Sequence, residues 1–150
     1  MPLRGKFGGQ FGDTSGRPYL EGRLLLPRLN ISGYISFLVD TGADTSLLNP
    51  IDSKRLGIDF NTLTGDEESW GLGGSVHSYV EDALLIFSET GVALYVYSFD
   101  LSISPDDPAI PADLPSLLGR DVIDNWRMTY SPSRQNLTFH VFSADVTIPL

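Results

Sequence analysis

The segment Phe37–Thr45 constrains this chain more than any other part of its sequence. Its first three residues are apolar and form the end of a predicted buried strand, and Asp40, Thr41 and Gly42 follow directly. A carboxyl group at the end of such a strand is partly withdrawn from water, which suits it to proton transfer. Gly42 lets another backbone or a ligand come close. A plain Asp-Thr-Gly turn that ends a strand is the alternative interpretation.

Short apolar runs separated by turns continue this pattern along the chain. The turns contain glycine, proline, asparagine or aspartate, which is typical of connections between strands. We expect strands at residues 19–26, 34–39, 76–80, 83–87, 92–99, 117–118, 127–130 and 136–142. Two short helices are expected at residues 51–56, between an N-cap at Asn49 and Gly57, and at residues 120–126. The pattern predicts an all-β, closed, barrel-like fold with a short C-terminal helix.

The charge of the chain is unevenly distributed. The net charge is −9, yet half of the lysines and arginines lie in the first 28 residues. Nucleic-acid binding needs a basic face, so we expect no nucleic-acid partner. Residues 1–18 are rich in glycine and predict a flexible N-terminal leader, with a basic tail for an acidic surface as the alternative. Residues 19–150 then form one folded domain.

The composition excludes several kinds of site. The chain has no cysteine, which excludes disulfides and thiolate ligands, and two histidines are too few for a histidine-based metal site. We therefore expect no metal and no cofactor. No run of about 18 apolar residues could cross a membrane, and the N-terminus lacks the apolar stretch of a secretory signal. We expect no membrane partner and a cytoplasmic location.

Two further motifs follow the acidic one. Residues 71–74 (Gly-Leu-Gly-Gly) lie between two expected strands, and residues 117–121 (Leu-Leu-Gly-Arg-Asp) lead into the second helix. The first motif fits a tight hairpin or the tip of a lid. A phosphate-binding loop would need a helix after it, whereas residues 75–80 predict a strand. No serine lies in a Gly-x-Ser-x-Gly elbow, which argues against a Ser-His-Asp triad.

Together, these segments resemble the retropepsin-like aspartic proteases, a family of single-domain proteases. The resemblance runs from about residue 19 to residue 142 and rests on three motifs in the family's order. Residues 38–43 match the active-site loop, residues 71–74 resemble the flap tip, and residues 117–121 are similar to the segment before the C-terminal helix. The resemblance implies an acid-protease barrel that is active as a symmetric homodimer.

The resemblance also implies catalytic roles for Asp40, Thr41 and Gly42. Asp40 from each of two chains would face its twin and hold a water molecule between them. One carboxyl group stays protonated, because two carboxylates about 3 Å apart cannot both be charged. Thr41 would hydrogen-bond across the dimer axis and hold the two loops together.

Other residues would bind or brace in this family. Ala43 and Asp44 would contact the substrate backbone, and Arg120 would pair with Asp44 within one chain. An ordinary structural ion pair is the alternative for Arg120. The flap that would close over the substrate consists of Gly71, Leu72, Gly73 and Gly74.

The function implied by the resemblance is that of an aspartic endopeptidase acting on peptide or protein substrates. The chain has one Asp-Thr-Gly and is too short for a second lobe, so the second carboxylate would come from a second copy. We expect the terminal hairpin, residues 127–142, to contribute interface strands. The alternative is a catalytically silent dimer of the same fold that binds peptides or mediates assembly.

Overall fold

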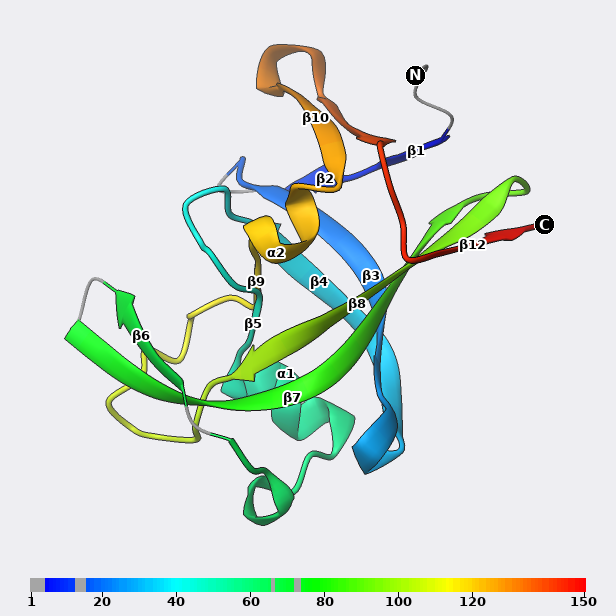
Figure 1. Cartoon of the computed structure of the whole chain (residues 1–150). Coiled ribbons are helices and arrows are strands. Elements are labelled where there is room, and N and C mark those ends of the chain that lie inside the picture. The colour runs from blue at the N-terminus through cyan, green and yellow to red at the C-terminus, as the bar shows by residue number, and fades with distance from the viewer. Residues whose placement is uncertain (1–4, 13–15, 66, 72–73) are drawn as a thin grey trace.

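A larger sheet of nine strands and a smaller sheet of three strands form the molecule (Figure 1). The computed structural model of the chain describes residues 5–12, 16–65, 67–71 and 74–150. Its first half contains β1 (Gly5–Gly8), β2 (Gln10–Phe11), β3 (Pro18–Leu26), η1 (Pro27–Leu29), β4 (Ile31–Val39), β5 (Leu47–Leu48), α1 (Pro50–Leu56) and η2 (Phe60–Thr62). Its second half contains β6 (Glu67–Gly71), β7 (Gly74–Glu89), β8 (Ala93–Ile103), β9 (Leu117–Leu118), α2 (Arg120–Ile123), β10 (Trp126–Ser131), η3 (Pro132–Arg134), β11 (Asn136–Val141) and β12 (Val146–Pro149).

Six strands of the larger sheet close into a barrel. Their order is β8-β5-β9-β4-β3-β7, and β7 then pairs with β8 over the whole stretch from Tyr79 to Glu89. Closure removes the open edges of these strands, which protects their backbone groups without a covering layer. The expected all-β, barrel-like fold is confirmed.

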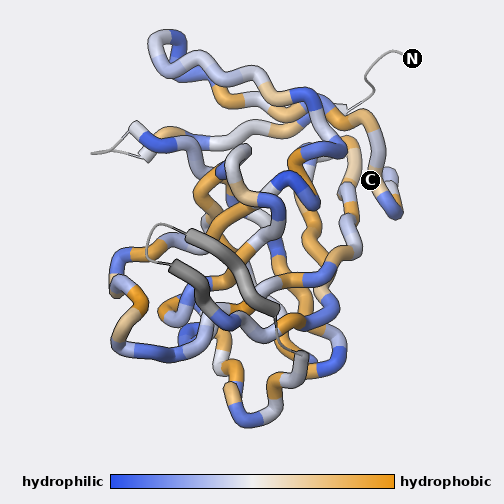
Figure 2. The backbone as a smooth tube through the Cα atoms, turned by 60° about the vertical axis from the view of Figure 1, so that its left-hand side comes forward, coloured by the Kyte–Doolittle hydropathy of each residue, from blue (hydrophilic) through white to orange (hydrophobic). Residues whose placement is uncertain are grey.

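Side chains that alternate along the strands fill the barrel. Leu24 and Leu26 of β3, Ile35 and Phe37 of β4, and Leu85 of β7 are fully buried. In Figure 2 hydrophobic residues gather along the crossing strands at the centre, whereas hydrophilic residues lie mainly in the outer turns. The alternation leaves every second residue of a strand facing outward.

The smaller sheet packs on the barrel through an aromatic cluster. Its strand order is β1-β11-β10, and Trp126 at the start of β10 makes edge-to-face contacts with Phe7 and Phe87 at centroid distances of 5.0 Å. The indole Nε1 of Trp126 donates to the Tyr97 hydroxyl, which donates to the carbonyl oxygen of Ser143. Burial raises the pKa of Tyr97 to about 12, so its hydroxyl group remains a donor at neutral pH.

The N-terminal segment differs from the prediction. Residues 1–18 were expected to be irregular, but β1 pairs with β11 and β2 pairs with β3. Phe7 is buried and stacks on Phe87 at 5.2 Å. A side chain at Gly9 would meet the carbonyl oxygen of Tyr19 at 2.7 Å, so this glycine permits close packing rather than disorder. The division between leader and domain at residue 18 stays a prediction.

Several other elements follow the sequence closely, and some do not. Helix α1 has the expected Asn49 cap, whose side chain accepts from the backbone N–H of Asp52, and ends at Gly57 in the left-handed conformation. The second helix is shorter than expected, because Trp126 already belongs to β10. The strands expected at residues 76–80 and 83–87 form one continuous strand, β7, and β12 was not predicted.

The burial of Phe7 gives a direct test of the role of β1. We expect Phe7→Ala to lower the free energy of unfolding by about 3 kcal/mol, because it leaves a cavity among aromatic rings. Tyr34→Ala, at a side chain that is 61% exposed, is the control and should change it by less than about 0.5 kcal/mol. Urea unfolding measures both. Equal stability of Phe7→Ala and wild type would show that β1 does not belong to the folded domain.

Candidate active site

Asp40 lies where the buried strand β4 reaches the surface. Its backbone N–H donates to the carbonyl oxygen of Leu118 at 2.9 Å, which continues the parallel pairing of β4 with β9. The Oδ1 atom of Asp40 accepts from the backbone N–H of Gly42 at 3.0 Å. The Asp40 side chain is half-buried, whereas Thr41 and Gly42 are exposed. One carboxylate oxygen is therefore held by the loop, and the carboxyl group as a whole stays accessible.

Strand β9 holds both ends of the loop that carries Asp40. It lies between β4 and β5, although β4 and β5 are neighbours in sequence. Gly119, directly after β9, passes so close to the loop that a side chain would meet the carbonyl carbon and oxygen of Thr45 at 2.7 Å. The backbone N–H of Arg120 then donates to the carbonyl oxygen of Ala43 at 2.8 Å. Glycine is required at this crossing because it has no Cβ.

A buried serine and an acid lock the same crossing. The Ser46 hydroxyl donates to Oδ1 of Asp121 at 2.7 Å, and the Ser46 backbone N–H donates to Oδ2 at 2.9 Å. The same hydroxyl accepts from the backbone N–H of Gly119 at 2.9 Å. Burial raises the pKa of the Asp121 carboxyl group, although the two hydrogen bonds from Ser46 act in the opposite direction.

Asp44 and Arg120 form an ion pair across this crossing. The Asp44 side chain is 82% exposed and the Arg120 side chain 48% exposed. An exposed pair of this kind contributes little to stability. The pair does fix the position of the exposed Asp44 carboxylate, four residues after Asp40.

The predicted hairpin around residues 71–74 is present. Strands β6 and β7 pair with Gly71 opposite Gly74 and Glu67 opposite Ser78. Leu72 and Gly73 lie outside the described residues, so the structure says nothing of the tip that we predicted there. In Figure 1 this hairpin and the loop that follows β4 both lie on the left-hand side of the molecule.

A buried carboxylate anchors the base of this hairpin. Glu81 of β7 is 4% exposed, and both of its oxygens accept from Nε of Arg28, at 3.1 and 3.0 Å. Arg28 lies in η1 and also donates from Nη2 to the carbonyl oxygen of Thr62 in η2 at 2.9 Å. The buried carboxylate of Glu81 needs a cation as partner, and Arg28 supplies it. Through Arg28, β7 is joined to the turns η1 and η2.

Metal ligands do not gather near this loop. Within residues 5–12, 16–65, 67–71 and 74–150, no three histidine or acidic side chains lie close enough to hold a metal ion. The same ranges contain no helix that is long and apolar enough to span a membrane.

The comparison with solved structures identifies the fold. A retropepsin-like aspartic protease from Rickettsia conorii aligns with a TM-score of 0.56 and 16% sequence identity, over 91% of both chains. The chain has a retropepsin-like fold. Two further solved structures align with lower scores. EIAV protease in complex with the inhibitor HBY-793 aligns with a TM-score of 0.48 and 21% identity, over 75% of this chain and 90% of that one. The retroviral protease-like domain of Ddi1 from Leishmania major aligns with 0.41 and 14%, over 87% and 92%.

Sequence comparisons add no closer relative. No protein-family model matches the chain, and no curated protein matches it. The retropepsin-like fold therefore rests on the structure, and identities of this size establish the fold alone.

Sequence reasoning missed the role of Ser46 and gave Asp121 no function. Ser46 is fully buried, and its contacts with Gly119 and Asp121 join two segments more than 70 residues apart. The only signal was a polar residue directly before the apolar pair Leu47-Leu48. The structure brings Asp40, Ala43, Asp44 and Arg120 to one loop crossing, while their roles in catalysis and binding stay predictions.

The Asp121 carboxyl group predicts a pH dependence of stability. The pKa of Asp121 is raised in the folded state, so the protonated carboxyl group favours folding. This contribution to the free energy of unfolding is lost as the pH rises above 3.8, the ordinary pKa of the group. The stability of wild type relative to Asp121→Asn should therefore be greatest at low pH, fall as the pH rises, and then level off. Urea unfolding between about pH 3 and 7 measures it, with the exposed Asp113→Asn as control. A relative stability that increases with pH would contradict the raised pKa.

Proposed function

We propose that the chain is an aspartic endopeptidase whose active site forms between two copies of Asp40. The observation that carries this proposal is that Asp40 has an accessible carboxyl group directly after the end of barrel strand β4, on a loop held by β9 and Gly119. A carboxyl group held in this way keeps its position without support from a substrate, as acid–base catalysis requires.

The chemistry follows from two such groups sharing one proton. The ionised Asp40 takes a proton from a water molecule, and the resulting hydroxide attacks the carbonyl carbon of the peptide bond. The protonated Asp40 of the other copy donates to the carbonyl oxygen. The proton removed from water later reaches the leaving amine. No covalent intermediate forms between enzyme and substrate.

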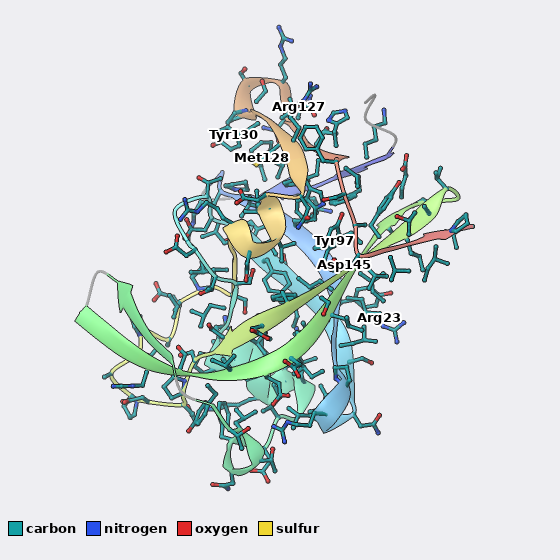
Figure 3. The ribbon with its side chains drawn as sticks, viewed as in Figure 1. Arg23, Tyr97, Arg127, Met128, Tyr130 and Asp145 are labelled. Atoms are coloured by element: carbon teal, nitrogen blue, oxygen red, sulfur yellow. The ribbon has the colours of Figure 1, made fainter. Side chains whose placement is uncertain are left out.

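Homodimerisation is part of the proposal, because the chain has only one Asp-Thr-Gly. The three-stranded sheet has β1 and β10 as its outer strands. Much of the terminal hairpin serves the chain's own core, since Leu137, Phe139 and Val141 are buried. Tyr130 on β10 (Figure 3) is 50% exposed and Phe142 61% exposed, and these are the apolar side chains of the hairpin that a second copy could cover.

The substrate in this proposal is an extended peptide. Ala43 and Asp44 lie beside Asp40, and the hairpin of β6 and β7 offers strand backbone to a peptide by strand addition. Gly71, Leu72, Gly73 and Gly74 would form the lid over it. The exposed carboxylate of Asp44, which also pairs with Arg120, would accept from substrate N–H groups.

The catalytic role of Asp40 is tested by substitution. We expect Asp40→Asn to lower kcat/KM on a peptide library by at least about 100-fold, because the amide can neither take up nor donate the transferred proton. Asp113→Asn, at an exposed carboxylate of the 104–115 loop, is the matched control and should retain activity. A statine-type transition-state mimic should inhibit the wild type. Equal cleavage by Asp40→Asn and wild type would overturn the assignment of catalysis to Asp40, and no cleavage by the wild type would favour the silent peptide-binding dimer.

The role of Thr41 is tested by dimer affinity. A hydroxyl group that hydrogen-bonds across the two-fold axis contributes twice per dimer, about 2 kcal/mol in total, so Thr41→Val should raise the dimer Kd roughly 30-fold. Thr41→Ser keeps the hydroxyl group and should stay near wild type. Sedimentation over a range of protein concentrations measures all three. The same Kd for all three proteins would remove Thr41 from the interface.

A further inference from the structure

One face of the β7–β8 pair, continued by β12, carries apolar side chains on the outside of the barrel. Cross-strand partners share a face of a sheet, and so do alternate residues of a strand. Ala83, Leu85 and Phe87 point into the core. The opposite side, which we call the outer face, carries the apolar residues Leu84, Ile86, Leu94, Val96, Val146 and Ile148.

This outer face is open to solvent at β12. Val146 is 52% exposed and Ile148 42% exposed, and they lie opposite Val96 and Leu94 of β8. Strand β12 is also the last strand of its sheet, so its outer edge is unpaired in the part of the chain that the structure describes. Contiguous apolar side chains beside an unpaired edge are typical of a binding surface.

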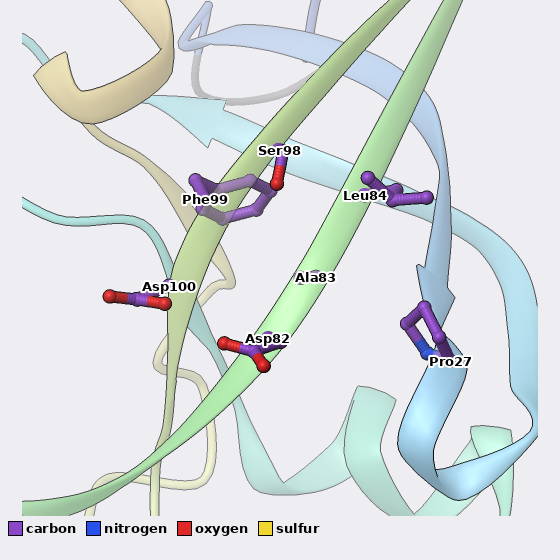
Figure 4. A pocket seen from close by; sticks show the side chains of 7 residues that line it. All are labelled: Pro27, Asp82, Ala83, Leu84, Ser98, Phe99 and Asp100. Carbon is purple, nitrogen blue, oxygen red and sulfur yellow. The ribbon is translucent and has the colours of Figure 1, made fainter.

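A hollow with two carboxylates lies at the other end of the outer face. It has a volume of about 530 Å³ and is lined by residues of β7 and β8 together with Pro27 (Figure 4). Asp82 and Asp100 are directly opposite each other in the strand register, and both are exposed. Leu84 and Pro27 also line the hollow, so it combines negative charge with apolar surface.

Asp82 and Asp100 place like charges on directly opposite residues of neighbouring strands, and the chain neutralises them incompletely. Like charges directly opposite on neighbouring strands destabilise a sheet. Asp82 attracts Arg28, but the Arg28 guanidinium group is bound to Glu81 and to the carbonyl oxygen of Thr62. Asp100 has no ion pair with any residue that the structure describes. A cation from another molecule would relieve this repulsion.

We propose that the outer face binds an extended segment of a partner protein in which apolar residues are followed by Lys or Arg. The cationic head lies between Asp82 and Asp100, and its methylene stem packs on Leu84. The apolar side chains of the segment cover the half-buried Leu94 together with Val146 and Ile148. This binding uses no atom of Asp40 and does not depend on the proposed proteolysis.

Fluorescence anisotropy with two labelled peptides tests the proposal. One probe has alternating valine and threonine followed by two lysines, and the matched probe has two glutamates in place of the lysines. All proteins carry Asp40→Asn, so that cleavage does not interfere. We expect the lysine probe to bind and the glutamate probe to fail. Asp82→Asn/Asp100→Asn and Val146→Thr/Ile148→Thr should each weaken binding by roughly fivefold or more.

Further measurements make each outcome decisive. Binding by neither probe, or binding that only one of the two double variants weakens, overturns the proposal. Displacement of the lysine probe by a statine-type inhibitor places it in the cleft beside Asp40 and also overturns the proposal. A dimer that Val146→Thr/Ile148→Thr converts to monomers, without probe binding, assigns the face to a second copy of this chain instead. Asp100→Asn alone should raise Tm, since it removes the repulsion from Asp82, and an unchanged or lower Tm removes that part of the argument.

Discussion

The pairing of β9 with β4 is the contact on which the rest of the site depends. Two residues, Leu117 and Leu118, separate β4 from β5, and the loop between those strands must pass around them. The loop can do so only because Gly119 has no side chain where the backbone of Thr45 crosses. Ser46 and Asp121 then fasten the crossing with hydrogen bonds. A short strand thereby determines where Asp40 lies.

Different kinds of contact stabilise the two ends of the barrel. At one end, Trp126 joins the small sheet to the barrel through aromatic contacts and one hydrogen bond to Tyr97. At the other end, Glu81 and Arg28 join β7 to the turns beneath it. The first contact is apolar and tolerates few changes of shape. The second joins a buried carboxylate to a half-exposed guanidinium group, and it fixes the position of β7 relative to the turns.

Local signals predicted the elements, and distant contacts decided what was missed. The Asn49 cap and the Gly57 terminus of α1 can be predicted from neighbouring residues in the sequence. The same holds for the strand that precedes Asp40. Phe7 is different, because its partners Phe87, Trp126 and Phe139 lie about 80 to 130 residues away and the glycines around it suggested disorder. The contact of Ser46 with Asp121 spans 75 residues and has no local signature. Neither could be predicted from neighbouring residues.

The contact between Arg28 and Glu81 holds β7 close to the point where this strand extends beyond the barrel. β7 stays paired with β8 as far as Tyr79, five positions from Gly74, and an extended strand rises about 3.3 Å per residue, so the arm beyond the barrel is about 16 Å long. A rotation of about 10° where the strand leaves the barrel displaces the end of such an arm by about 3 Å. A small change of direction where Arg28 holds Glu81 is therefore magnified along β7 toward Gly74.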